Sequence, residues 1–260
     1  MSEQPARPAR PARPGHVLVV TGRERLTPGM VRVHFSAEDR ATFGQAFAAS
    51  AFTDRYLKLS FPQPDGSEVV RTYTALEPDP GEGTVTIDFV VHGTDGIAGP
   101  WAAVAAPGER ITVRGPGGAY APDPTADWHL LAADEAGLPA VRAALAALPA
   151  DAQGYAVVHV PAETHRQQLP APAGMQVSWV VDAAPGALVD AVLALEWLPG
   201  RVQVFVHGEA EAVMHGIRPY LTRERAVPRG DLSVSGYWRR GRTEEGFRTW
   251  KRELADADSR

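Results

Sequence analysis

The sequence contains no cysteine. Without thiols the chain can form no disulfide bond, hold no iron–sulfur cluster and build no thiolate zinc site. Its eight histidines are scattered without metal-ligand spacing, so we expect no metal held by the protein. Any redox chemistry must therefore come from a bound organic cofactor or from a metal that arrives with the substrate.

Long apolar runs are also missing. No run approaches the roughly 18 residues that a membrane span needs, and the first fourteen residues, which repeat Pro-Ala-Arg, lack the apolar stretch of a secretory signal. We therefore expect a cytoplasmic protein without membrane insertion. A net charge of −5, with no basic and aromatic platform, argues against nucleic acid as a partner. We expect a monomer.

The first half of the chain is predicted to be β structure. Segments rich in β-branched or alternating residues are separated by turns that contain Gly and Pro. Six strands at this spacing predict a closed, antiparallel barrel of the Greek-key type. The expected strands span residues 17–20, 30–35, 56–61, 68–74, 84–91 and 110–113.

The second half alternates strand-like and helix-like segments. Such alternation predicts βαβ units around a parallel sheet, and at 260 residues the chain is long enough for two domains. The expected helices span residues 137–148, 186–197 and 209–221. We expect a disordered tail over residues 1–14, a β-barrel domain over 15–122 and an α/β domain over 123–260 that ends in a strand and a helix.

The most informative motif is Arg71-Thr72-Tyr73-Thr74, at the end of an expected strand. Because side chains alternate along a strand, Arg71 and Tyr73 should share one face and Thr72 and Thr74 the other. A guanidinium can pair with a pyrophosphate, a phenol ring can lie against a flavin, and a threonine hydroxyl can bond to a ring nitrogen. The motif is thus compatible with a flavin dinucleotide, although a strand with an exposed arginine would read the same way.

A second segment follows in the appropriate order. The stretch 88–93 ends another expected strand, and a glycine-rich loop then leads to a helix that we expect to begin at Pro100, directly after Gly99. Free N–H groups at a helix start can face a phosphate. The segment is also what an ordinary connection would look like.

Together these motifs resemble the siderophore-interacting protein family, whose members are flavin-dependent reductases of ferric siderophores within the wider ferredoxin-reductase-like group. The resemblance extends from about residue 17 to 253. It is carried by residues 71–74, by 88–93 with 99–102, by 133–140, and by 236–241 with Glu244 and Glu245.

The resemblance implies an FAD-binding barrel followed by an NAD(P)H-binding-like domain. It places Arg71 at a phosphate, Tyr73 over the flavin and Thr74 at the edge of the flavin ring, which makes Tyr73 and Thr74 the candidate catalytic residues. The implied FAD-binding residues are Arg71, Thr72, Tyr73, Thr74, Asp88, Val90, His92, Ala98, Gly99, Trp101 and Ala102.

An electron donor, NADH or NADPH or else a ferredoxin, is expected to dock on the second domain. The residues expected on the nicotinamide side are Asp134, Glu135, Gly208, Glu209 and Trp238. No Gly-x-Gly-x-x-Gly follows a strand of this domain, but ferredoxin-reductase-like domains bind nicotinamide cofactors without it.

The expected substrate is a ferric siderophore. Such chelates are commonly anionic, so cations should lie beside the flavin. Lys58 occupies the position where the resemblance places a substrate-binding lysine, and Arg114, Arg239 and Arg240 are further candidates. For Lys58, a solvated position on the outer face of the barrel is an equal alternative.

Two positions depart from the family pattern. Leu76 stands where the family commonly has an arginine, and Ala136 stands where it commonly has a threonine. The first affects flavin affinity or the substrate rim, and the second leaves the choice of donor open. A reductase of the same architecture for another acceptor, and a protein that holds ferric siderophore without reducing it, remain alternative functions.

Overall fold

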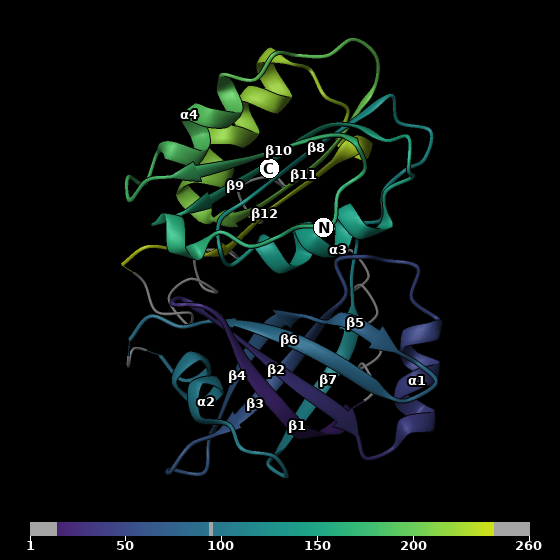
Figure 1. Cartoon of the computed structure of the whole chain (residues 1–260), viewed down its shortest axis with the longest axis vertical. Coiled ribbons are helices and arrows are strands. Elements are labelled where there is room, and N and C mark those ends of the chain that lie inside the picture. The colour runs from purple at the N-terminus through teal and green to yellow at the C-terminus, as the bar shows by residue number, and fades with distance from the viewer. Residues whose placement is uncertain (1–14, 94–95, 242–260) are drawn as a thin grey trace, which may run out of the picture.

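The protein, described from a computed structural model for residues 15–93 and 96–241, consists of two stacked lobes (Figure 1). We call the part carrying the first sheet, residues 15–93 and 96–117, the β lobe. The α/β lobe spans residues 128–241. The expected tail over 1–14, the C-terminal helix and the motif residues Glu244 and Glu245 lie outside the described residues.

The β lobe is one antiparallel sheet of seven strands in the order β4-β3-β7-β1-β2-β6-β5. Its strands are β1 (Gly15–Thr27), β2 (Met30–Ala37), β3 (Tyr56–Pro62), β4 (Glu68–Thr74), β5 (Leu76–Asp79), β6 (Thr84–Val90) and β7 (Arg110–Gly117), and its helices are α1 (Arg40–Ala48) and α2 (Ala98–Val104). The sheet curls so that the ring of Tyr73 on β4 lies 4.4 Å from that of Phe89 on β6.

The predicted fold class is confirmed, with one difference in how the barrel closes. Among the described residues, β4 and β5 are the two edges of the sheet, and no ladder of hydrogen bonds joins either edge to another strand of the sheet. The curl is instead filled by side chains, with Phe43 and Phe47 of α1 and Ala98 and Ala102 of α2 in its core. Strand β4 is therefore an edge strand of this sheet.

Two elements of this lobe were not predicted, α1 and β5. In α1, Asp39 accepts a hydrogen bond from the N–H of Thr42 (3.0 Å) and so begins the helix. Gly44 lies inside the helix, and because glycine disfavours helices the sequence did not predict this one. A Cβ at this position would lie 2.1 Å from the carbonyl oxygen of Pro80. The glycine is thus required by close packing.

The α/β lobe is a parallel sheet of five strands in the order β10-β9-β8-β11-β12. Its elements are β8 (Trp128–Ala133), α3 (Leu138–Ala147), β9 (Gln153–Val160), η1 (Glu163–His165), β10 (Gly174–Val181), α4 (Ala187–Leu193), β11 (Val202–Glu209), η2 (Glu211–Ile217), η3 (Tyr220–Glu224), η4 (Arg229–Asp231) and β12 (Leu232–Trp238). The helix expected over residues 209–221 is present as η2 and η3, both wound more widely than an α-helix. No described helix is long and apolar enough to cross a membrane.

Helix α3 lies between the two sheets (Figure 1). Its buried face packs in a core that also contains Met30, Leu26 and Val90 of the β lobe, and Met30 is fully buried there. The lobes therefore share apolar packing in addition to the covalent linker.

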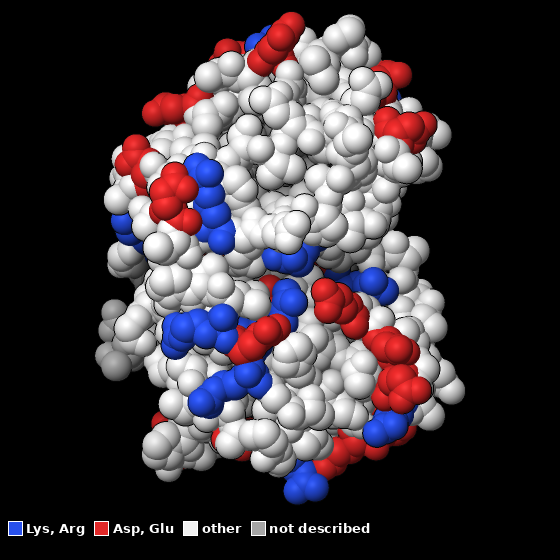
Figure 2. All heavy atoms as spheres, in the orientation of Figure 1, with Lys and Arg blue, Asp and Glu red and all other residues white. Residues whose placement is uncertain are grey.

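On the face of the molecule shown in Figure 2, basic side chains gather around the waist between the lobes, with acidic side chains among them.

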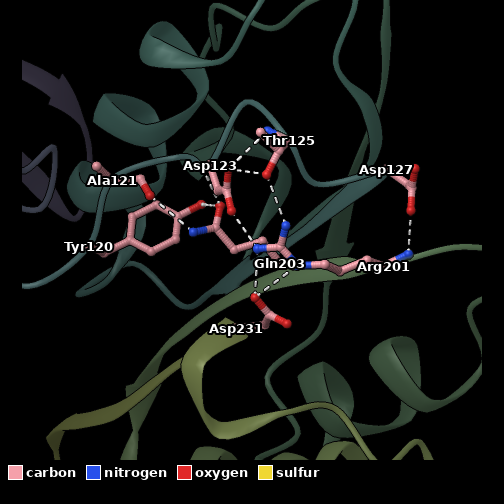
Figure 3. A network of polar contacts seen from close by, with 8 residues as sticks. All are labelled: Tyr120, Ala121, Asp123, Thr125, Asp127, Arg201, Gln203 and Asp231. Carbon is pink, nitrogen blue, oxygen red and sulfur yellow. Dashed lines mark hydrogen bonds and ion pairs between the residues drawn. The ribbon is translucent and has the colours of Figure 1, made fainter.

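The linker between the sheets is anchored on β11 (Figure 3). The guanidinium of Arg201 pairs with the carboxylates of Asp123 and Asp231 and donates to the hydroxyl of Thr125 (3.0 Å). Gln203 donates to the carbonyl of Ala121 (3.0 Å). These bonds hold the linker against the start of β11.

Candidate functional site

A cleft of about 1090 Å³ opens between the two lobes. Its first wall contains the edge strand β4, and its second wall lies at the carboxyl ends of the parallel strands. The chain leaves β8 toward β9 on one side and later returns to β11 on the other, so the ends of β8 and β11 form a topological switch point, where open α/β sheets bind ligands. The volume is at the upper end for small-molecule sites, which are roughly 300–1,000 Å³.

Strand β4 presents its predicted motif to this cleft. Arg71, Thr72, Tyr73 and Thr74 all line it. Tyr73 packs against the core of the β lobe, whereas Thr72 is exposed on the opposite face of the sheet, as the strand period predicts. Because β4 is an edge strand, its outward backbone groups also face the cleft.

Two of the candidate substrate-binding cations lie in one row across the sheet of the β lobe. Lys58 on β3 is opposite Thr72 on β4 and opposite Arg114 on β7, so the three side chains share one face. Lys58 is exposed and lines the cleft, and Arg114 is exposed just beyond the lining.

Asp88 and its neighbours lie at the junction of the lobes. Asp88, Val90 and His92 line the cleft as expected. The carboxylate of Asp88 is buried and receives two hydrogen bonds from Arg32 on β2, at 2.7 and 3.0 Å. This bidentate pair raises the pKa of Arg32 and commits both oxygens of Asp88 to its own lobe.

Asp134 connects the ends of three strands in the second wall. Its Oδ1 accepts the N–H groups of Ala136 (2.9 Å) and Gly137 (3.2 Å), and its Oδ2 accepts the N–H of Glu209 (2.8 Å) and the indole N–H of Trp238 (2.7 Å). Burial raises the pKa of Asp134, and the hydrogen bond from Trp238 opposes that rise. The carboxylate thus fills the start of α3 and fixes a tryptophan that lines the cleft.

The remaining residues of the expected nicotinamide side are also here. A Cβ on Gly208 would lie 2.9 Å from Cγ of Asp134, so only glycine leaves room for this carboxylate. Glu209 accepts the N–H groups of Ala212 (2.9 Å) and Arg240 (3.1 Å). Glu135 lines the cleft and is paired with His165, whose Nδ1 lies 2.7 Å from Oε1 of the glutamate.

Four expected FAD contacts, Ala98, Gly99, Trp101 and Ala102, lie in α2, outside the cleft lining. The expected start of this helix was wrong, because α2 begins at Ala98 and Pro100 is its third residue. The earlier start places Ala98 and Ala102 in the core. The indole of Trp101 packs against Phe89 (5.7 Å between centroids) and donates to Glu109 (3.1 Å). The cofactor contacts assigned to this helix stay predictions.

Three other positions can now be placed. Arg239 pairs with Glu211 at 2.9 Å and lies outside the lining, whereas Arg240 lines the cleft. Leu76 is buried and also lies outside the lining. The structure therefore gives this leucine a packing position on β5.

The sequence analysis missed several cleft residues, among them Asp54, Tyr56, His159, Asp182 and His207. Tyr56 is opposite Thr74 and two residues from Lys58 on the same strand, so the period of two could have identified it. Asp54 accepts the N–H groups of Ala119 (2.8 Å) and Tyr120 (2.9 Å). No sequence signal links it to residues so far along the chain.

The curled antiparallel sheet whose edge strand faces the switch point of a parallel sheet is the fold of the ferredoxin reductase in carbazole 1,9a-dioxygenase, which is 20% identical with a TM-score of 0.66, over 86% of this chain and 68% of that one. Residues 126–241 match the family model described as siderophore-interacting protein, and residues 65–120 match the model described as siderophore-interacting FAD-binding domain. The chain belongs to the siderophore-interacting protein family.

Individual relatives agree with this assignment. The uncharacterized protein Rv2895c of Mycobacterium tuberculosis is 44% identical, over 94% of this chain and 97% of that protein. The ferric vibriobactin reductase ViuB of Vibrio cholerae is 32% identical, over 75% of this chain and 73% of that protein. The crystal structure of a siderophore utilization protein from T. fusca is 37% identical, with a TM-score of 0.77, over 88% of this chain and 94% of that one.

The groups on the first wall fit FAD. Arg71 offers a guanidinium for a pyrophosphate, Tyr73 offers a half-buried ring, and Thr74 offers a buried hydroxyl, all on one strand that faces the cleft. A guanidinium, an aromatic ring and a hydroxyl on one strand match the pyrophosphate and the flavin ring of FAD, an elongated ligand with an anionic middle.

Proposed function

We propose that the protein is an FAD-dependent reductase of ferric siderophores that works in the cytoplasm with NADH or NADPH as electron donor. The observation that carries this proposal is that the FAD-type motif of β4 and the switch point of the parallel sheet line one cleft. The similarity to a ferric vibriobactin reductase supports the choice of acceptor. A reduced ferredoxin is the alternative donor.

In this proposal the β lobe holds the cofactor. Arg71 binds the pyrophosphate, Tyr73 covers the ring system, and Thr74 donates to or accepts from the ring edge. When bound, FAD takes up two electrons as a hydride and passes them on singly. No side chain has to act as an acid or base on the chelate, so the residues contribute by placing and screening the reactants.

The β lobe also holds the chelate. Lys58 and Arg114 share one face of the sheet, and Arg240 lines the cleft from the other lobe. Together they present positive charge to an anionic ligand. One NAD(P)H supplies two electrons, so two chelated Fe(III) ions become Fe(II), and NAD(P)⁺ and one proton are released. Siderophores hold Fe(II) far less tightly than Fe(III), so the metal leaves.

The first test is the absorbance spectrum of the purified protein, with added FAD if it is colourless. Under anaerobic conditions NADH or NADPH should bleach the flavin, and a ferric catecholate or hydroxamate with an Fe(II) trap should restore it. Bleaching without Fe(II) would indicate another acceptor, and bleaching by reduced ferredoxin alone would exclude the nicotinamide donor. Failure to bind FAD would overturn the proposal.

The role of Lys58 can be tested by substitutions that remove or keep its charge. Lys58→Ala should raise the KM for an anionic ferric chelate about three- to tenfold, because a charged contact of about 1 kcal/mol is lost. Lys58→Arg keeps the charge and should stay near the unmodified protein. Activity with a neutral acceptor should be unaffected in both variants, and an equal loss with both acceptors would contradict a role in substrate binding.

A further inference from the structure

His165 joins the two lobes beside the cleft. It ends the short helix η1, in the connection between β9 and β10 of the α/β lobe. Its Nδ1 lies 2.7 Å from Oε1 of Glu135, and the two side chains are only 16% and 9% exposed. Glu135 itself lines the cleft and directly follows Asp134, whose carboxylate bonds to the ends of neighbouring strands. The pair is therefore mostly buried, and only its glutamate lines the cleft.

The same pair rests on the backbone of the β lobe. A Cβ on Gly29, in the turn between β1 and β2, would lie 2.6 Å from Cε1 of His165 and 3.2 Å from Oε1 of Glu135. The turn thus accepts both side chains only because residue 29 is glycine. The carbonyl of Gly29 in turn accepts the N–H of Val91 (2.8 Å), which follows the cleft residue Val90.

The next residues along the connection repeat this contact. The amide of Gln167 lies 3.1 Å from Sδ of Met30, and Arg142 of α3 donates to Gln167 (2.8 Å). Met30 is opposite Val90 in the β lobe sheet. His165 and Gln167 of one connection therefore contact Gly29 of the β1–β2 turn and Met30, the first residue of β2.

We propose that Gly29, Glu135 and His165 form a junction clamp that aligns the two walls of the cleft, and that His165 is a positioning residue for hydride transfer from the donor to FAD. This inference rests on the proposed function. In that function FAD and the chelate-binding cations Lys58 and Arg114 belong to the β lobe, with Arg240 added from the α/β lobe, whereas the donor is held by the α/β lobe. Hydride transfer is then the step that must cross the junction.

The two half-reactions should respond differently to the clamp. Hydride transfer needs the reacting atoms within about 3–3.5 Å, and a displacement of about 1 Å can cost on the order of 100-fold. Reoxidation by the ferric chelate needs no donor on the α/β lobe, and FAD, Lys58 and Arg114 all lie on the β lobe. Loss of the clamp should thus slow reduction of the flavin and leave its reoxidation unchanged.

The decisive experiment separates these half-reactions by anaerobic stopped-flow absorbance. Gly29→Ala moves the imidazole and His165→Leu removes its bond, and each should slow flavin reduction by NADH or NADPH about tenfold or more. His165→Gln keeps an N–H donor for Glu135 and should recover most of the rate. After reduction by dithionite, reoxidation by a ferric chelate should match that of the unmodified protein, as should the Kd for FAD.

Two substitutions serve as matched controls. Gly230 has open space around the position of a Cβ, so Gly230→Ala tests the effect of a methyl group alone. His34 forms an exposed pair with Glu24 at 3.5 Å within the β lobe, so His34→Leu removes a histidine–glutamate pair that does not cross the junction. Neither control should change either half-reaction.

Hydrogen exchange gives a readout that needs no activity. The amide of Val91 bonds to the carbonyl of Gly29, so it should exchange faster in His165→Leu than in the unmodified protein. Unchanged exchange at Val91, or an equal loss in both half-reactions, would overturn the clamp. A protein that binds FAD but is not reduced by either nicotinamide would instead refute the proposed donor, and the exchange at Val91 would still decide whether His165 holds the junction.

Discussion

The two walls of the cleft use their charged residues in opposite ways. On the β lobe, Lys58 and Arg114 are exposed and Arg71 lines the cleft. On the α/β lobe, the carboxylates of Asp134, Glu135 and Glu209 are occupied by backbone N–H groups, an indole and an imidazole. Lys58 and Arg114 of the first wall thus stay exposed, whereas these three carboxylates of the second wall hold parts of their own lobe together.

This contrast teaches that a charged residue in a cleft is not by itself a ligand contact. A carboxylate that accepts four hydrogen bonds has little capacity left for a substrate. Substitutions on the α/β wall should therefore reduce the free energy of unfolding. Substitutions on the β wall should reduce ligand affinity at little cost in stability.

The largest expected effect is on stability, from Asp134→Asn. An amide group can replace only one of the two carboxylate oxygens, so its NH₂ would face two of the four N–H donors. We expect a loss of about 2–4 kcal/mol in the free energy of unfolding, measured by urea denaturation. Asp65→Asn, in an exposed turn, is the control and should cost well under half as much. If Asp134→Asn reduced FAD affinity without changing stability, the structural role inferred for this wall would be wrong.

The second effect is on affinity, from Arg71→Gln. Removing a charged hydrogen-bond donor to a phosphate should weaken FAD binding about ten- to 100-fold, which corresponds to about 1.4–2.8 kcal/mol. Titration calorimetry measures it. Arg25→Gln is the control, because Arg25 is exposed in the same lobe and donates to the carbonyl of Pro28. Equal losses of FAD affinity in the two variants would contradict a contact between Arg71 and the cofactor.

The smallest effect concerns the linker, which belongs to neither wall. The hydrogen bond from Arg201, with those from Thr125, holds the pKa of Asp123 below its ordinary value. A depressed pKa means that the stabilisation is complete above the ordinary pKa of about 4 and disappears as the pH falls through the lowered value. Asp123→Asn should thus lower the melting temperature at pH 7 by about 1–2 °C. The difference should shrink steadily as the pH falls below about 4, and a difference that stayed constant down to about pH 2 would point to lost packing instead of lost charge.

Much of the fold could be predicted because it depends on local patterns. The period of two placed Tyr73 and Thr72 on opposite faces, and the bounds of β4 agree with the expected strand over 68–74. Helix α1 escaped prediction because Gly44 argues against a helix, and the reason for that glycine is the backbone of Pro80, far along the chain.

Less of the site could be predicted, because its walls are joined by contacts between distant residues. Asp134 was expected on the nicotinamide side, but its partners Glu209 and Trp238 lie 75 and 104 residues away. His165 was not singled out at all, since a lone histidine in a connection carries no signal until the turn at Gly29 is placed beside it. Motifs identify which residues face a cleft, and only the structure shows which of them are already engaged.

The position of Met30 has a consequence for protein engineering. This residue belongs to the β lobe by sequence and by strand pairing, but its side chain is fully buried in the core that surrounds α3. A chimera that combined the β lobe with the α/β lobe of a relative would therefore have to recreate the socket for this methionine. In this protein the unit to exchange is therefore the two lobes together, and a chimera that leaves the side chain of Met30 without its packing partners should have a weakened contact between its lobes.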